Sequence, residues 1–79
     1  MIYTRKIMTG YYRVLDTTFG DQGWKVEKDE TLQGNLIWSI NNTDTEKLED
    51  FIMDGNDQLW ATKSEALEAL QDYIFLQHF

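Results

Sequence analysis

Residues 62–76 read TKSEALEALQDYIFL, the longest helical pattern in the chain. Apolar residues recur there at intervals of three and four, which places their side chains on one face of an α-helix. Thr62 and Glu65 form a capping box, so we expect the helix to begin there and to run to about Leu76. A single helix of this length is marginal in water, and its apolar face must therefore pack on another element. The expected packing residues are Ala66, Leu67, Leu70, Tyr73 and Ile74.

The first half of the chain supplies a sheet for this helix. Two segments rich in aromatic and β-branched residues flank Thr9-Gly10, which predicts a hairpin. Two later segments alternate apolar and polar residues, the period of a half-buried strand. The sequence therefore predicts an α+β fold, in which a three- or four-stranded antiparallel sheet is covered by the C-terminal helix. The expected strands are residues 2–8, 11–15, 24–28 and 36–40, with a loop at 16–23.

A short acidic helix is expected between the sheet and the C-terminal helix. Thr43 and Glu46 form a second capping box, and Gly55 offers a C-terminal cap, which together indicate a helix over residues 44–53. Residues 58–61 are expected to form a brief strand or an extended segment. The apolar positions of the short helix are Leu48, Phe51 and Ile52.

The composition fits one folded domain over residues 1–79. Of the 79 residues, 42% are hydrophobic and 14% are aromatic, which is too rich in core-forming side chains for disorder. The absence of cysteine excludes disulfides and thiolate metal sites. No apolar run approaches the roughly 18 residues needed to cross a bilayer, and the first residues lack the apolar stretch of a signal peptide. We therefore expect a cytoplasmic protein that does not contact membranes.

Charge is divided unequally between the two halves of the sequence. Residues 1–40 contain five basic and five acidic residues, whereas residues 41–79 contain nine acidic residues against Lys47 and Lys63. The whole net charge of -7 therefore belongs to the second half. If the fold separates the halves, the molecule has an acidic face, and such a face attracts basic proteins and repels nucleic acid and anionic membranes.

Metal and cofactor sites are not expected. Residues from Asp54 to Glu65 follow the ligand spacing of a calcium loop, but the sixth position, normally glycine, is Leu59. A zinc site needs several histidine, cysteine and carboxylate ligands, and the chain has one histidine and no cysteine. That histidine, His78, lies one residue from the end of the chain, where a general base is poorly held. We therefore expect folding that does not depend on divalent metal.

Enzymatic activity and direct nucleic-acid binding are also not expected. Glu46 and Asp50 are spaced as neighbours on a helix, but acid and base catalysis needs a deep pocket that a domain of this size rarely encloses. A pI near 4.4 repels nucleic acid unless the two halves face opposite directions. Tyr11 and Tyr12 are adjacent on a strand and face opposite sides, so one of them is a candidate for an exposed contact; we assign this role to Tyr12.

Small size, a cysteine-free acidic composition, aromatic strands and a carboxylate-rich helical half together resemble the small inhibitors that phages and mobile elements encode, including anti-CRISPR proteins. The resemblance covers the whole chain in composition and layout and implies a location in the host cell. The segments GWKVE at 23–27 and WATKSEA at 60–66 also resemble the strand and the helix start of small strand-rich bacterial domains, in which a helix packs on a sheet. Those domains share no single activity.

The resulting functional expectation is a protein-binding module. Carboxylates along a helix approximate the charge density of a phosphate backbone, so they can occupy a nucleic-acid groove on a partner. We expect a stoichiometric inhibitor of a host nuclease or another nucleic-acid-processing protein. The alternatives are an assembly module that homo-oligomerises through a sheet edge, a small-ligand-binding domain, and a solvated acidic face with no partner. The predicted partner-binding residues are Glu46, Glu49, Asp50, Asp54, Asp57, Glu65, Glu68, Asp72 and Tyr12.

Overall fold

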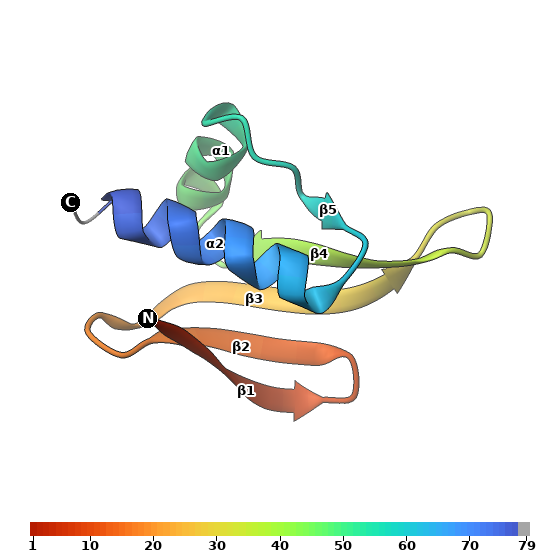
Figure 1. Cartoon of the computed structure of the whole chain (residues 1–79), viewed down its shortest axis with the longest axis horizontal. Helices are drawn as coiled ribbons and strands as arrows, with labels where there is room; N and C mark the ends of the chain where they lie inside the picture. The colour runs from red at the N-terminus through yellow and green to blue at the C-terminus, as the bar shows by residue number, and fades with distance from the viewer. Residues whose placement is uncertain (78–79) are drawn as a thin grey trace.

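A computed structural model describes residues 1–77 and shows a five-stranded antiparallel sheet with two helices (Figure 1). The predicted α+β class is confirmed, and the sheet has five strands where three or four were predicted. The elements are β1 (Ile2–Met8), β2 (Tyr11–Asp16), β3 (Gly20–Glu30), β4 (Leu36–Asn42), α1 (Thr45–Met53), β5 (Leu59–Trp60) and α2 (Lys63–Gln77).

The sheet is a meander in which each strand pairs with the next one along the chain. The predicted hairpin at Thr9-Gly10 is confirmed, with Gly10 at φ 77°. The strand missed by the count is β5, a two-residue segment in which Trp60 pairs with Trp38 of β4. The sequence predicts a brief strand or an extended segment at residues 58–61, and β5 forms there because the chain from α1 to α2 passes along the edge of β4.

The turn between β2 and β3 is shorter than the loop expected at 16–23. Asp16 is buried at the end of β2, and its carboxylate accepts the backbone N–H groups of Thr18 at 2.7 Å and Phe19 at 3.0 Å. These two bonds reverse the chain within three residues, and Gly20, at φ 71°, already pairs with Asp16. β3 therefore begins four residues earlier than the sequence pattern indicates.

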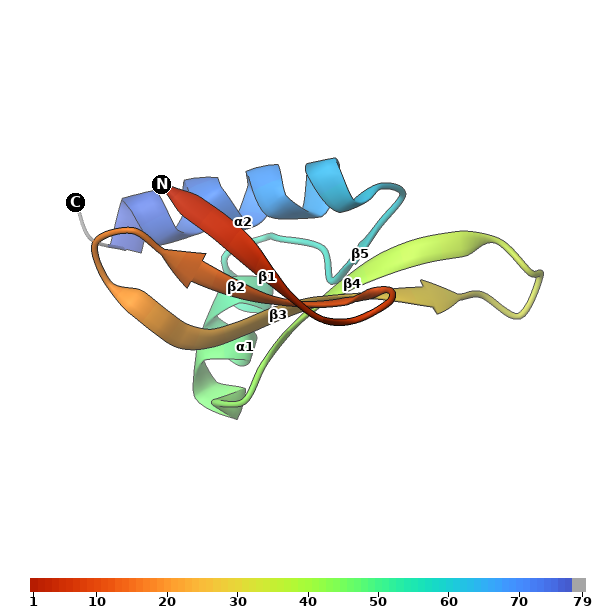
Figure 2. The same ribbon diagram turned by 90° about the horizontal axis from the view of Figure 1, so that it is seen from below.

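The helix α2 lies along one face of the sheet and buries its apolar stripe there (Figures 1 and 2). Leu70 and Ala66 are fully buried, and Thr62 caps the helix by accepting the N–H of Glu65 at 3.1 Å. The predicted stripe and its cap are thus confirmed. The core beneath α2 consists of Val14, Trp24, Val26, Ile40, Phe51, Ala66, Leu70, Tyr73 and Ile74.

The helix α1 joins this core through Phe51, whose ring centroid lies 5.5 Å from that of Trp24 and 5.0 Å from that of Tyr73. The predicted cap at Thr43 is wrong. The cap is Asp44, whose carboxylate accepts the N–H of Glu46 at 3.0 Å. The difference arises because Asn42 accepts the N–H of Asp44 at 2.8 Å and so turns the chain one residue later.

Candidate binding surfaces

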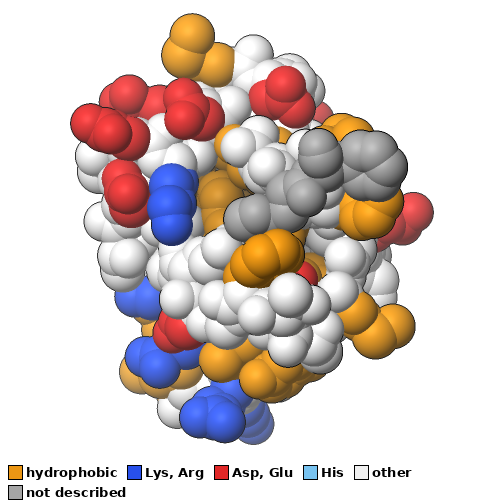
Figure 3. All heavy atoms as spheres, turned by 90° about the vertical axis from the view of Figure 1, so that its left-hand side faces the viewer, with side chains coloured by type: hydrophobic (Ala, Val, Ile, Leu, Met, Phe, Trp, Pro, Cys, Tyr) orange, Lys and Arg blue, Asp and Glu red, His pale blue; other side chains and the backbone are white. Residues whose placement is uncertain are grey.

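The helix α1 and the β1–β2 hairpin lie at different ends of the molecule (Figure 1), and charge is separated accordingly. In Figure 3, Asp and Glu side chains gather over α1 in the upper part, whereas Lys and Arg side chains gather over β1 and β2 in the lower part. The basic end is the β1–β2 hairpin, whose exposed charged side chains are Arg5, Lys6 and Arg13. Its one acidic residue, Asp16, is buried.

The side of α1 that faces solvent carries what we call the α1 acidic cluster: Glu46, Glu49, Asp50 and Asp54. At 3.6 residues per turn, Glu46 and Glu49 lie opposite the buried Phe51. Met53 lies among these carboxylates on the same side, and 84% of its surface is exposed. The cluster is therefore an acidic surface with an apolar side chain within it.

Neither lysine of the acidic half neutralises these carboxylates. Lys47 Nζ donates to the carbonyl oxygen of Gln22 at 3.4 Å, and Lys63 Nζ lies 3.5 Å from the ring centroid of Tyr12. Among residues 1–77, ion pairs within 4.0 Å join only Asp16 to the amino group of Met1 and Arg13 to Asp21. The carboxylates of α1 and α2 are consequently left without a cationic partner in the described part of the chain.

The acidic residues of α2 form a second surface. Glu65, Glu68 and Asp72 recur at helical spacing on its exposed side and, with Trp60 and Ala69, line a hollow of about 260 Å³. The indole N–H of Trp60 is buried and has no acceptor among residues 1–77. The remaining predicted acidic residue, Asp57, is exposed in the loop before β5.

Tyr12, expected to be an exposed contact, is half-buried. Its ring packs against the core beside Trp38, at 6.0 Å between centroids, with Lys63 above it. Tyr11 lies on the opposite face of the sheet, where Lys25 Nζ is 5.9 Å from its ring centroid. Alternation along β2 requires the two tyrosines to diverge, but the sequence does not say which of them the helix covers.

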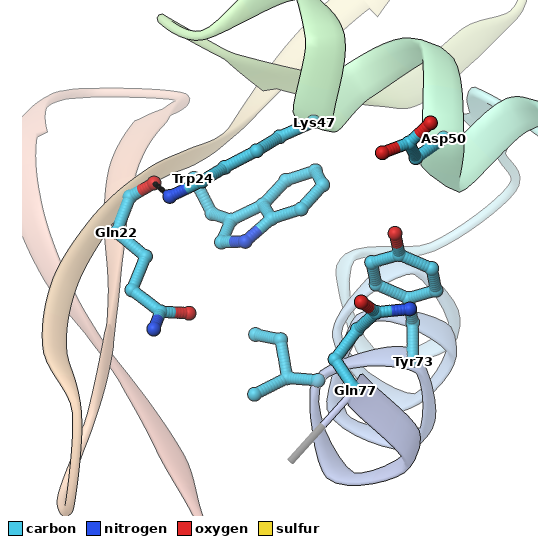
Figure 4. A pocket seen from close by; sticks show the side chains of 7 residues that line it. Gln22, Trp24, Lys47, Asp50, Tyr73 and Gln77 are labelled. Atoms are coloured by element: carbon cyan, nitrogen blue, oxygen red, sulfur yellow. Dashed lines mark hydrogen bonds between the residues drawn. The ribbon is translucent and has the colours of Figure 1, made fainter.

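The pocket between β3 and the two helices has a volume of about 280 Å³ (Figure 4). Trp24 and Ile74 form its apolar wall, and the side chains of Lys47 and Asp50 border it from α1. Burial, and then the negative charges of Asp50 and Asp54, raise the pKa of the Tyr73 hydroxyl at this pocket. This pocket is where a small ligand would bind under the small-ligand alternative. The hydrogen bond from Lys47 to the Gln22 carbonyl lies at its border.

A feature that the sequence did not predict lies on the sheet face opposite α2. Arg5 pairs with Arg13, and Arg13 pairs with Lys25, so three cations stand side by side on β1, β2 and β3. We call these three residues the basic row. They are separated by seven and eleven residues in sequence, and only the strand register brings them together. Arg13 is partly offset by Asp21, at 3.4 Å.

Features that would identify a function directly are few. No three histidine or acidic side chains among residues 1–77 are grouped closely enough to hold a metal ion. The calcium-like segment is used otherwise, since Asn56 donates to the Phe51 carbonyl and Thr62 caps α2. His78 lies outside the described residues. No helix in the described part is long and apolar enough to span a membrane.

Comparison of the chain with protein-family models, with curated proteins and with solved structures found no match. The α1 acidic cluster, the α2 hollow, the pocket and the basic row are therefore the features from which a function has to be inferred.

Proposed function

We propose that this protein binds a basic protein surface through its helical half and thereby blocks nucleic acid from that surface. The observation that carries the proposal is the arrangement of the two lysines of this half. Both are turned toward the sheet, at Gln22 and Tyr12, so that they leave the carboxylates unpaired. Because exposed like charges repel one another, an unpaired acidic surface costs stability that a basic partner would recover.

The α1 acidic cluster supplies the charge pattern for such a contact. Glu46, Asp50 and Asp54 follow one another at intervals of four residues, so their Cβ atoms are about 5 to 6 Å apart along the helix. Met53 provides an apolar side chain among them, and methionine is among the residues enriched in protein interfaces. Charge around an apolar centre favours both rapid encounter and a defined contact.

The α2 hollow fits a cationic side chain of the same partner. Its three carboxylates can pair with a guanidinium or ammonium group, and the adjacent indole of Trp60 offers a surface on which a guanidinium stacks. We propose an arginine as the inserted residue, because its planar group makes bidentate bonds to carboxylates. The partner would be a nuclease or another nucleic-acid-processing protein of the host, with the protein acting as a stoichiometric inhibitor.

The test is a comparison of partner capture by two charge-reversed variants. Glu49→Lys with Asp50→Lys alters the α1 acidic cluster, and Asp29→Lys with Glu30→Lys makes the same change in net charge on exposed positions of β3. Proteins captured from nuclease-treated bacterial lysate are identified, and the best candidate is purified. Its affinity for each variant is then measured at 50 and 300 mM salt, alone and with an oligonucleotide competitor.

We expect the α1 variant to bind at least tenfold more weakly and the β3 variant to bind like the parent. Binding of the parent should weaken with salt, because exposed charge pairs are screened over about 10 Å at 0.1 M ionic strength. An oligonucleotide should compete for the same site. Equal affinities for the two variants, or a complex unaffected by the oligonucleotide, would contradict the proposal.

A further inference from the structure

We infer that the basic row is a docking surface for the α1 acidic cluster of a second copy of this chain, which gives head-to-tail association. The inference rests on the proposed function in one respect, since it also uses the α1 acidic cluster as a binding surface. It adds the basic row as a second binding surface, on the sheet face opposite α2. It also gives the α1 acidic cluster a second binding partner, the basic row of another copy.

The basic row is costly unless a negative surface covers it. Like charges directly opposite on neighbouring strands destabilise a sheet, and here Arg5, Arg13 and Lys25 occupy three such positions in succession. The helices do not cover this part of the sheet, because α2 lies on the other face and α1 contacts β4 (Figures 1 and 2). Neighbouring strands are about 4.8 Å apart, so the row presents three cations within about 10 Å.

The surroundings of the basic row favour a protein over a nucleic acid as its occupant. Tyr3 and Ile7 on β1 are 46% and 43% exposed, and Tyr11 lies on the same face of β2. Tyrosine and arginine together are typical of interface centres. Glu27 and Asp29 of β3 lie further along this face, where they would repel a phosphate chain but not an apolar side chain.

The α1 acidic cluster complements the basic row in charge and in apolar surface. Its carboxylates match the cations, and Met53, with Ile52 beside it, offers apolar surface for Tyr3 and Ile7. The acidic end lies away from the basic end of the same copy, along the axis over which the molecule extends 27 Å (Figure 3). With a screening length of about 8 Å at physiological salt, each end acts locally despite the net charge of -7.

Symmetric dimers are disfavoured by the same charges. Two β1 edges paired with each other would bring Arg5 and Lys6 of one copy against those of the other, and lysine on an edge strand guards against such pairing. Two α1 acidic clusters would repel equally. Only the contact between unlike surfaces is attractive, and the inferred head-to-tail rotation does not close, so that association continues beyond the dimer.

The experiment is sedimentation equilibrium of the purified chain up to millimolar concentration at 50 and 300 mM NaCl. We expect the average mass to rise with concentration past twice 9.4 kDa at low salt, and to rise much less at high salt. Arg5→Glu with Arg13→Glu, and separately Glu49→Lys with Asp50→Lys, should each remain monomeric. An equimolar mixture of the two variants should associate again, because one basic row and one α1 acidic cluster remain intact.

Lys28→Glu controls for charge reversal elsewhere on the sheet, because Lys28 is an exposed cation of β3 outside the basic row, and this variant should associate like the parent. If Arg13→Glu disturbs folding through its pairing with Asp21, Arg5→Gln with Arg13→Gln should show the same loss. A monomeric parent at 50 mM NaCl, a basic-row variant that associates like the parent, or a mixture that stays monomeric would overturn the inference. A monomeric parent that instead binds an oligonucleotide through Arg5 would assign the row to nucleic acid.

Failure of this inference is distinguishable from failure of the proposed function. The Arg5 and Arg13 variant leaves the helical half unchanged, so it should still capture a basic partner while losing self-association. If the parent associates and captures no partner, the proposed function fails alone; if it captures a partner and stays monomeric, the inference fails alone.

Discussion

Asp16 shows how one carboxylate can hold a turn and make stability depend on pH. The N–H groups of Thr18 and Phe19 bond to its carboxylate and lower the pKa of Asp16 below its ordinary value of 3.8, against the opposing effect of burial. Because the folded pKa is lower than the unfolded one, the stabilisation is fully present above about pH 4 and is lost as pH falls through the folded pKa.

We therefore expect Asp16→Asn to be less stable than the parent at pH 7, with the difference shrinking as pH falls below about 4. Urea unfolding of both proteins between pH 7 and pH 2.5, followed by circular dichroism, measures this difference directly. Asp29→Asn, an exposed carboxylate on β3, controls for the change in net charge. A parent and an Asp16→Asn variant whose stabilities differ by a constant amount at every pH would show that the turn does not depend on the ionised carboxylate.

At the level of elements, the junction of β4 and α1 depends on the absence of a side chain at Gly23. This residue has φ 89°, and a Cβ atom there would lie 2.6 Å from Thr43 Oγ1 and 2.7 Å from Asn42 Oδ1. The Asn42 side chain bonds to the Gln22 carbonyl and to the Asp44 N–H, so it links β3 to the start of α1. A side chain at position 23 would displace this link.

We expect Gly23→Ala to destabilise the fold more than Gly20→Ala. Both glycines have positive φ, which costs an alanine about 1 to 2 kcal/mol, but a Cβ at Gly20 meets nothing within 4 Å. The clash at Gly23 should add about 1 to 3 kcal/mol, the usual cost of overpacking. Urea midpoints of the two variants give the comparison, and equal losses would mean that the close approach of Asn42 is easily relaxed.

The same junction shows which elements the sequence could predict. The hairpin at Thr9-Gly10 and the stripe of α2 depend on local periodicity and turn chemistry, and both were predicted correctly. The Asp44 cap and the start of β3 at Gly20 were not, because they depend on short-range bonds to the side chains of Asn42 and Asp16, which leave no mark on the periodicity of the sequence. The separation of charge followed from residue counts, whereas the basic row depends on strand register.

At the level of the whole molecule, the fold keeps its acidic residues together. Glu46 and Asp50, Asp50 and Asp54, and Glu68 and Asp72 are like-charged neighbours four residues apart, and each such pair destabilises a helix by about 0.2 to 0.5 kcal/mol. With the two lysines of this half turned away, nothing in residues 41–77 offsets the repulsion by an ion pair. The separation of charge that suits binding is therefore expected to lower the stability of the unbound chain.

This cost should be visible as a rise of the melting temperature with salt. Raising NaCl from 10 to 300 mM screens the repulsion and should stabilise the chain by about 1 kcal/mol, which is roughly 4 to 8 °C for a domain of this size. Melts are recorded at low micromolar concentration to keep the chain monomeric. Asp50→Asn with Glu68→Gln removes all three like-charged pairs, so this variant should melt higher than the parent at 10 mM NaCl and respond less to salt. As a control, Asp29→Asn with Glu30→Gln changes the net charge by the same amount and should keep the parent's salt response. A parent whose melting temperature does not change with salt would show that the acidic surface is too well solvated to need a partner.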